Sequence, residues 1–299
     1  MNQPVIGFIG LGHMGQPMAS RLAGAGFALV VADTSAAARE ALVRAGATSC
    51  ATAREVADAA DIVFASLPTP DVVRQVALGE DGVVHGRRMK LFVDLSTTGP
   101  LVAAEVARGI AAAGRAEVLD CPVSGGVAGA AKGTLTLMAA GSPSALELAG
   151  PVLQHLGNQR LCGQTPGHGQ MVKVINNLLS VVAMAASSEA LVLAERAGLD
   201  PKLMFDVINV SSGASNASQT KVPKHILPRT YDFGFSTALS QKDVRLCLDQ
   251  AEALGVPMPV GSMARQILTM TAASFGGEAD FTMMHRLLEQ LAGGPTPKE

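Results

Sequence analysis

The feature that most constrains the fold is a glycine-rich segment near the start of the chain, between a predicted strand and a predicted helix. Residues 5–9 form an apolar run typical of a buried parallel strand, and residues 14–22 have helical composition. Between them, Gly10, Gly12 and Gly15 have the G-x-G-x-x-G spacing. In such a unit the first glycine permits a tight turn, the second lets the backbone approach a pyrophosphate, and the third lets helix and strand pack closely.

An acidic residue after the next apolar run supports the same interpretation. Residues 27–32 form the second predicted strand, and Asp33 follows it at about the twenty-residue offset at which a carboxylate binds ribose hydroxyls. The N-terminus of the intervening helix offers N–H groups and a positive dipole end to phosphates. A glycine-rich turn alone can be purely structural, but strand, helix and acid together predict dinucleotide binding.

The composition excludes several classes of partner. The 299 residues carry a formal net charge of −2, which gives no electrostatic reason to expect nucleic acid or an anionic membrane as a partner. We expect no signal peptide and no apolar stretch of membrane-spanning length, and therefore a cytoplasmic protein or one in a compartment whose targeting peptide has been removed. The six histidines share no ligand spacing and the four cysteines are scattered, so no metal is expected and the thiols are interpreted as structural.

The pattern along the chain predicts two domains. Strand-like segments at 61–66, 90–95, 117–120 and 135–140 alternate with helical segments at 36–45, 71–78 and 101–113, which is typical of a Rossmann-type, doubly wound α/β sheet over residues 1–164. Residues 170–197 contain no glycine or proline and predict one long helix. The remaining segments are helical, so we expect an all-helical domain over residues 165–299, joined through the long helix, with a disordered tail at 293–299.

Two groups of polar residues are candidates for chemistry. Lys173 and Asn177 stand four apart on one face of the long, otherwise apolar helix, near the domain junction where clefts form. A lysine in a partly dehydrated cleft exchanges protons near neutrality, although a solvent-facing polar stripe would explain the same pattern. Ser124, Gly125 and Gly126 offer a hydroxyl and N–H groups to a small anion, although an ordinary loop has the same composition.

Four segments together resemble a known family. They are residues 7–18 (GFIGLGHMGQPM), 94–100 (DLSTTGP), 120–133 (DCPVSGGVAGAAKG) and 167–177 (GHGQMVKVINN), followed later by Lys242-Asp243. The chain resembles the β-hydroxyacid dehydrogenases, the group of 3-hydroxyisobutyrate dehydrogenase and tartronate semialdehyde reductase, over nearly its whole length. On residues alone, Lys242-Asp243 would be interpreted as a surface charge pair.

The resemblance implies a role for each candidate. Lys173 would pass a proton to or from the substrate hydroxyl while hydride moves to or from nicotinamide, and Asn177 would hold that oxygen or the carboxylate. Ser124, Gly125 and Gly126 would anchor the carboxylate of a small-molecule substrate. The implied cofactor-binding residues are Gly10, Leu11, Gly12, His13, Met14, Gly15, Asp33, Leu67, Pro68, Thr97, Phe235 and Lys242.

Asp33 and the residues that follow it favour NAD as the cofactor, with NADP as the alternative. A 2′-phosphate would meet the like charge of Asp33, and no arginine follows directly, since Arg39 comes a helical turn later.

The substrate is predicted only as a short 3-hydroxy acid or its semialdehyde. Asn216 stands where the hydroxyisobutyrate branch usually has tryptophan, and Ser236 where the tartronate branch usually has arginine. The alternatives are a tartronate- or succinic-type semialdehyde reductase, an imine reductase, and a non-enzymatic dinucleotide sensor. The family's helical domain usually dimerises or tetramerises, so a homodimer or homotetramer is expected.

Overall fold

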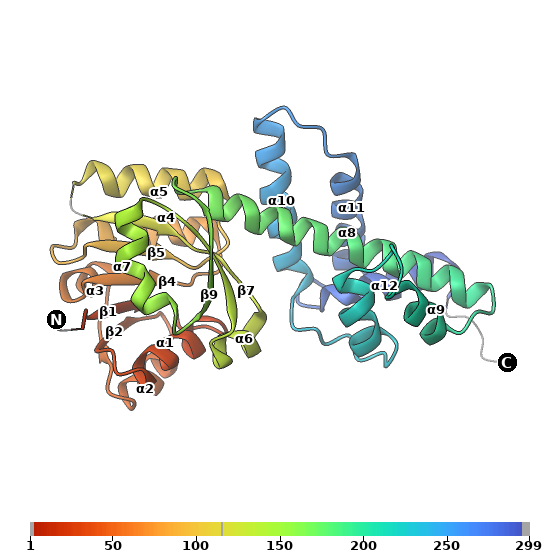
Figure 1. Ribbon diagram of the computed structural model, residues 1–299, viewed down its shortest axis with the longest axis horizontal. Coiled ribbons are helices and arrows are strands. Elements are labelled where there is room, and N and C mark those ends of the chain that lie inside the picture. Colours follow the sequence, from red (N-terminus) through yellow and green to blue (C-terminus); the bar gives the residue numbers. More distant parts are fainter. Residues whose placement is uncertain (1–2, 115, 295–299) are drawn as a thin grey trace. The chain divides into compact units, whose positions relative to one another are not determined.

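The computed structural model describes residues 3–114 and 116–294, which form two compact units (Figure 1). The first unit ends at Lys173 and the second begins at Val174. This division lies inside the long helix α8, His168–Arg196, whereas the sequence analysis places the boundary between residues 164 and 165. Residues 295–299 of the tail that we expect to be disordered lie outside the described residues.

The first unit contains one sheet, which confirms the predicted doubly wound α/β fold. Its strand order is β3-β2-β1-β4-β5-β6-β8-β7, with β9 paired to β8. The pairs from β3 to β6 are parallel, and β8 runs antiparallel to β6 and β7. The strands are β1 Ile6–Ile9, β2 Leu29–Ala32, β3 Thr48–Ser49, β4 Ile62–Ala65, β5 Leu91–Asp94, β6 Glu117–Asp120, β7 Val123–Ser124, β8 Leu135–Ala140 and β9 Gly157–Gly163.

Helices cover both faces of this sheet, which is why strands β1, β2, β4 and β5 are buried at every position and almost entirely apolar. Alternate side chains of a strand point to opposite faces, so Ile6 and Phe8 pack against one layer and Ile9 against the other. The first layer contains α1 Gly15–Gly24, α2 Ala36–Val43, α6 Gly126–Lys132 and α7 Pro143–Leu153. The second contains α3 Ala53–Ala59, α4 Pro70–Leu78 and α5 Pro100–Ala112, with a short 3-10 turn at Val83–His85.

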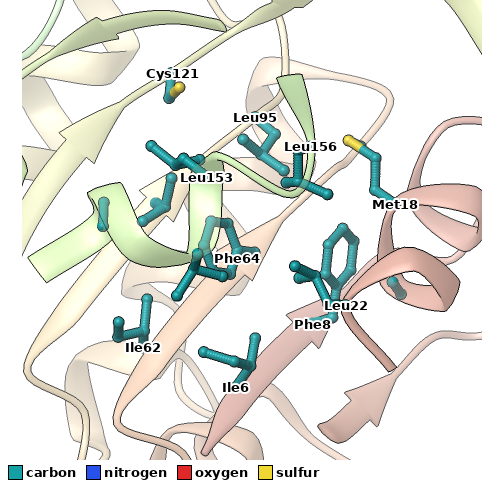
Figure 2. Close-up of a cluster of buried hydrophobic side chains, with 14 of the residues drawn as sticks. Ile6, Phe8, Met18, Leu22, Ile62, Phe64, Leu95, Cys121, Leu153 and Leu156 are labelled. Carbon is teal, nitrogen blue, oxygen red and sulfur yellow. The ribbon is translucent and has the colours of Figure 1, made fainter. Parts of the chain in front are cut away.

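Figure 2 shows the core between the sheet and the first layer, where Met18 and Leu22 of α1 meet Phe8 of β1. The rings of Phe8 and Phe64 stack with centroids 6.1 Å apart across the pairing of β1 with β4. Because this core fixes α1 on β1, it also fixes the glycine-rich loop that joins them.

The second unit is helical, as predicted, apart from an isolated bridge between Ser236 and Asp280. Gly198, Gly255 and Gly276 have positive φ angles just after the ends of helices, where glycine commonly terminates a helix. Residues 217–226 form a π-helix, which the sequence analysis did not predict. After α8 the elements are α9 Pro201–Ile208, the π-helix Ala217–Ile226, α10 Thr237–Ala253, α11 Pro259–Phe275, a 3-10 turn at Phe281–Met283 and α12 Met284–Leu291.

Helix α8 corrects one expectation. The helix has 29 residues, and the mean hydropathy of its most apolar 18-residue window is 1.6. By length and composition it could therefore cross a membrane. The expectation that no stretch reaches this length was wrong, because small and apolar residues far outnumber the charged residues along the helix. In the structure 44% of that window is buried. The core helix of a soluble protein can have the same length and apolar composition.

Candidate active site

The glycine-rich loop has the geometry that its sequence predicts. Gly10 has a φ of +89°, and a Cβ there would overlap the carbonyl oxygen of Ser66. A Cβ on Gly15 would overlap the carbonyl oxygen of Gly10, so α1 approaches β1 as closely as glycine allows. A Cβ on Gly12 would meet no protein atom within 4 Å, so the chain itself does not require glycine there. No side chain caps the first turn of α1. The Gln16 N–H bonds to the Gly12 carbonyl and Pro17 has no N–H, so an anionic ligand such as a pyrophosphate would meet the N–H groups of the loop just before the helix.

Asp33 is fixed beside this loop. Its Oδ2 accepts a hydrogen bond from the Leu11 N–H at 2.6 Å, and its Oδ1 accepts one from the Ser35 N–H at 2.7 Å. The guanidinium of Arg39 donates to the backbone carbonyl of Asp33. The sequence analysis set Arg39 aside as a helical turn away, but α2 carries it back to Asp33. A cation therefore lies at the backbone of the residue whose carboxylate the NAD preference depends on.

The remaining cofactor candidates of the first unit follow neighbouring strands. Leu67 and Pro68 come after β4 and Thr97 after β5, and both strands run parallel to β1. Their loops therefore meet the glycine-rich loop at the carboxyl edge of the sheet, where the strand order reverses and ligands bind. The Ser96 hydroxyl accepts the Leu67 N–H at 2.9 Å and ties two of these loops together. His13 and Pro68 are exposed, Met14 and Thr97 are half-buried, and Leu11 is buried.

The predicted anion cradle lies at the end of β7. Ser124 is half-buried and pairs in register with Thr136 of β8. Gly125 and Gly126 are exposed, with φ angles of +133° and +64° that favour glycine. This backbone leaves a hydroxyl and N–H groups at the surface, as a carboxylate-binding loop requires.

Two polar residues that sequence reasoning did not assign hold the first turn of α8. Gln170 is fully buried: its Oε1 accepts the N–H groups of Thr98 and Gly99 at 2.9 and 3.2 Å, and its Nε2 donates to the Ser96 carbonyl at 2.9 Å. Its backbone N–H donates to Asp120 Oδ2 at 2.8 Å. Gln170 lies within the GHGQMVKVINN segment that carries the resemblance, and a glutamine in an apolar helix was the available signal.

Within this network, burial disfavours the charged form of the Asp120 carboxylate. Burial raises the pKa of Asp120 to about 7, against the opposing effect of the backbone N–H groups of Gln170 and Gly167. Asp120 Oδ1 is buried without a hydrogen-bond partner among the described residues. The neighbouring Asp94 accepts the Ser96 N–H at 2.9 Å and the Thr98 hydroxyl at 3.2 Å. The result is a rigid anchor three residues before Lys173.

Lys173 is buried, with 9% of its surface exposed. The alternative of a solvent-facing polar stripe therefore does not describe this lysine. Asn177, one turn later, is half-buried. Gln170 and Lys173 lie in the first two turns of α8. The bonds of Gln170 to the loop that contains Thr97 therefore fix the start of the helix that carries Lys173 and Asn177.

In the second unit, Asp243 joins Asn177 to Lys242. The Asn177 amide donates to Asp243 Oδ2 at 2.6 Å, and Lys242 Nζ lies 3.2 Å from Asp243 Oδ1. The side chains of Lys242 and Asp243 are only 15% and 4% exposed, so the surface-pair interpretation is wrong. Phe235 lies elsewhere in this unit, with its ring against Phe281 at 5.9 Å between centroids.

One further cluster has metal-ligating side chains. Ligand atoms of Glu195, His285 and Glu289 lie within 4.8 Å of one another. However, Arg229 donates to both carboxylate oxygens of Glu289, each at 2.8 Å, and desolvation lowers the pKa of His285. An arginine on both oxygens satisfies the carboxylate that a cation would need, so the arrangement is that of an ion pair between a partly exposed arginine and a buried carboxylate. The absence of a metal stays a prediction.

Comparison with known proteins identifies the family of the chain. Residues 5–172 match the family model of the NAD binding domain of 6-phosphogluconate dehydrogenase, and residues 167–288 match that described as NAD-binding of NADP-dependent 3-hydroxyisobutyrate dehydrogenase. A 2-(hydroxymethyl)glutarate dehydrogenase of Eubacterium barkeri is 38% identical over 96% of each chain. A 2-hydroxy-3-oxopropionate reductase of Escherichia coli is 35% identical over 96% of this chain and 98% of its own. The Mycobacterium tuberculosis 3-hydroxyisobutyrate dehydrogenase structure with L-serine is 37% identical, with a TM-score of 0.89 over 96% of this chain and 99% of that one.

The fold and the glycine-rich loop define a dehydrogenase or reductase that uses a nicotinamide dinucleotide. The chain belongs to the β-hydroxyacid dehydrogenase family, as the resemblance of its four segments predicts.

Proposed function

We propose that this protein interconverts a short 3-hydroxy acid and its semialdehyde with NAD(P). The observation that carries the proposal is the anchoring of α8 by Gln170, which sets the buried Lys173 three residues beyond the loop contacts of Ser96–Gly99. A dinucleotide sensor would need the glycine-rich loop but no buried lysine on this helix. The same lysine disfavours an imine reductase.

Each residue then has one task. Bound NAD(P) supplies the hydride acceptor for oxidation and the hydride donor for reduction. Lys173 takes the proton from the hydroxyl oxygen of the substrate, or returns it, and Asn177 holds that oxygen. Ser124, with the N–H groups of Gly125 and Gly126, binds the carboxylate, which keeps its charge throughout the reaction. Thr97 and Lys242 contact the nicotinamide half of the cofactor.

NAD is the proposed preferred cofactor, because Asp33 repels a 2′-phosphate. Arg39 at the Asp33 carbonyl supplies a compensating cation, so the preference is modest.

A homodimer or homotetramer is proposed, with the helical unit as its contact surface. The support is a set of exposed large apolar side chains on that unit, which a second copy would cover. They include Leu193, Leu203, Val210, Val260 and Met263. We also propose a cytoplasmic location, which agrees with four free cysteines.

The relatives are named for different substrates, so the substrate of this protein has to be identified by assay. A panel of 3-hydroxy acids and semialdehydes, followed at the nicotinamide absorbance, should yield turnover of at least one pair. Lys173→Ala should lower kcat by about two to four orders of magnitude and remove one ionisation from the pH–rate profile. The exposed Lys202 gives the matched control, Lys202→Ala. Turnover of no compound would overturn the function, and a Lys173→Ala variant with wild-type kcat would overturn the role of the lysine.

A further inference from the structure

A second buried lysine lies in the helical unit, outside the residues assigned so far. Lys221 is 1% exposed and occupies the middle of the π-helix Ala217–Ile226. Its Nζ donates to the Ser180 hydroxyl at 3.0 Å and to Asn216 Oδ1 at 2.7 Å. The rings of Phe233 and Phe281 lie 5.2 and 5.8 Å from the same nitrogen. The ammonium is therefore bounded by two neutral acceptors and two aromatic rings.

The positive charge of Lys221 has no anionic partner in the described part of the chain. No carboxylate oxygen of residues 3–114 or 116–294 lies within ion-pairing distance of its Nζ. Burial alone lowers its pKa to about 8, which leaves the lysine mostly protonated at neutral pH. A buried charge is costly unless it is paired, and aromatic rings compensate only part of that cost. An anion that reached this ammonium would therefore gain a strong partner.

The ammonium lies close to the surface despite its burial. Asn216 is exposed and Ser180 is half-buried, so a ligand that touches either side chain is one hydrogen bond away from Nζ. A lysine ammonium has three N–H donors, and these two acceptors use two of them. Lys221 also lies in a π-helix, a rare conformation that occurs frequently at functional sites.

The position of Ser180 relates this lysine to the substrate. Ser180 follows Asn177 by three residues on α8, so the two side chains are neighbours on one face of the helix. Lys173 precedes Ser180 by seven residues, or about two turns, on that same face. A ligand held by Asn177 through one polar group can therefore reach Ser180 and Lys221 through another.

We propose that Lys221, Ser180 and Asn216 form a subsite for a second carboxylate on the substrate. The inference rests on the proposed function and narrows its substrate class to 3-hydroxy acids that carry an additional acidic group on the side chain. The carboxylate accepts the third N–H of Lys221, the Ser180 hydroxyl and the side-chain amide N–H of Asn216, whose Oδ1 keeps its bond to Lys221.

The experiment compares three ligands that share the HOCH2–CH–COO⁻ unit. They are 2-(hydroxymethyl)glutarate, its half-ester methylated at the distal carboxylate, and 3-hydroxyisobutyrate. The wild type should oxidise the diacid with a kcat/KM about ten- to a hundred-fold above that of the half-ester, the range expected for a hydrogen bond to a charged group. Lys221→Met should remove this preference while turnover of the half-ester and of 3-hydroxyisobutyrate changes little, and Lys221→Arg should keep much of it.

Two further variants control for folding and for general charge. Lys224→Met removes an exposed lysine from the same π-helix and should leave the preference intact. Asn216→Asp puts a carboxylate next to the ammonium at an exposed position, and should abolish the preference even if Lys221→Met does not fold. Calorimetric binding of glutarate, in the presence of oxidised cofactor, should weaken in parallel.

The outcomes separate the two hypotheses. Equal kcat/KM for diacid and half-ester in the wild type would overturn the subsite while leaving the dehydrogenase intact. A preference that survives Asn216→Asp, or that survives Lys221→Met where this variant folds, would do the same. Absence of turnover with any 3-hydroxy acid or semialdehyde would instead overturn the proposed function.

Discussion

Replacement of Gln170 by methionine tests whether the first turn of α8 is held by the amide of this residue. Methionine has a similar length and flexibility, so the substitution removes hydrogen bonds with little change in volume. The wild-type side chain makes three of them, two from the N–H groups of Thr98 and Gly99 and one to the Ser96 carbonyl. Ser96 and Thr98 are 4% and 0% exposed, so water does not readily replace the lost partners.

Each buried polar group left without a partner costs about 1–3 kcal/mol. With partial relaxation of the loop, Gln170→Met should lower the free energy of unfolding by about 3–6 kcal/mol, a large share of the total stability of a domain. The measurement is urea unfolding followed by far-ultraviolet circular dichroism, since the chain has no tryptophan. In the folded variant, kcat should also fall, because Lys173 stands one turn beyond Gln170.

The matched control is Gln154→Met, which changes an exposed glutamine of the same unit. It should shift the urea midpoint little, because its amide bonds only to a nearby carbonyl at the surface. If Gln170→Met and Gln154→Met unfold at the same urea concentration, with unchanged slopes, the buried network does not stabilise the fold as we have argued.

Three other predictions follow from the site. Because the folded pKa of Asp120, about 7, lies above its ordinary value of 3.8, the folded state binds an extra proton between these values; wild-type stability should therefore fall as pH rises from about 4 to 7, and thermal melts of Asp120→Asn should show a weaker fall. Ser124→Ala should raise KM for the acid about ten- to a hundred-fold with kcat little changed, and a fall in kcat at constant KM would contradict the anchoring role. Arg39→Ala should lower kcat/KM with NADP more than with NAD; an unchanged ratio would show that Arg39 does not reach the 2′-phosphate.

Local patterns were enough to predict the glycine-rich loop and the use of a nicotinamide dinucleotide, whereas the contacts of the individual cofactor residues stay predictions. The roles of Gly10 and Gly15 depend on a strand, a turn and a helix that are contiguous in sequence, and the structure has the close contacts that this motif requires. Asp33 was found in the same way, because it ends the strand that follows. Arg39 was misjudged because its distance along the chain was counted, whereas its long side chain turns back from α2 to the Asp33 carbonyl.

Partners that are distant in sequence could not be predicted. Gln170 bonds to Thr98 across 72 positions and to Asp120 across 50, and no periodicity in one chain links such segments. The π-helix around Lys221 was also missed, because its wider hydrogen-bond pattern has no distinct residue spacing that we could recognise. Its charge was visible in the sequence, but its lack of a carboxylate partner appears only once the helical unit is folded.

The division of the chain inside α8 has a consequence for recombination between relatives. A crossover in the loop before His168 would move Gln170 and Lys173 with the helical unit and separate Gln170 from the parental Ser96–Gly99 loop and Asp120. A crossover after Lys173 would keep that network but join two parental sequences in the middle of one helix, with Asn177 and Ser180 from the other parent. Chimaeras of the first kind should work only when the loop after β5 is compatible, whereas those of the second kind transfer the proposed substrate-binding residues of the helical unit as one block.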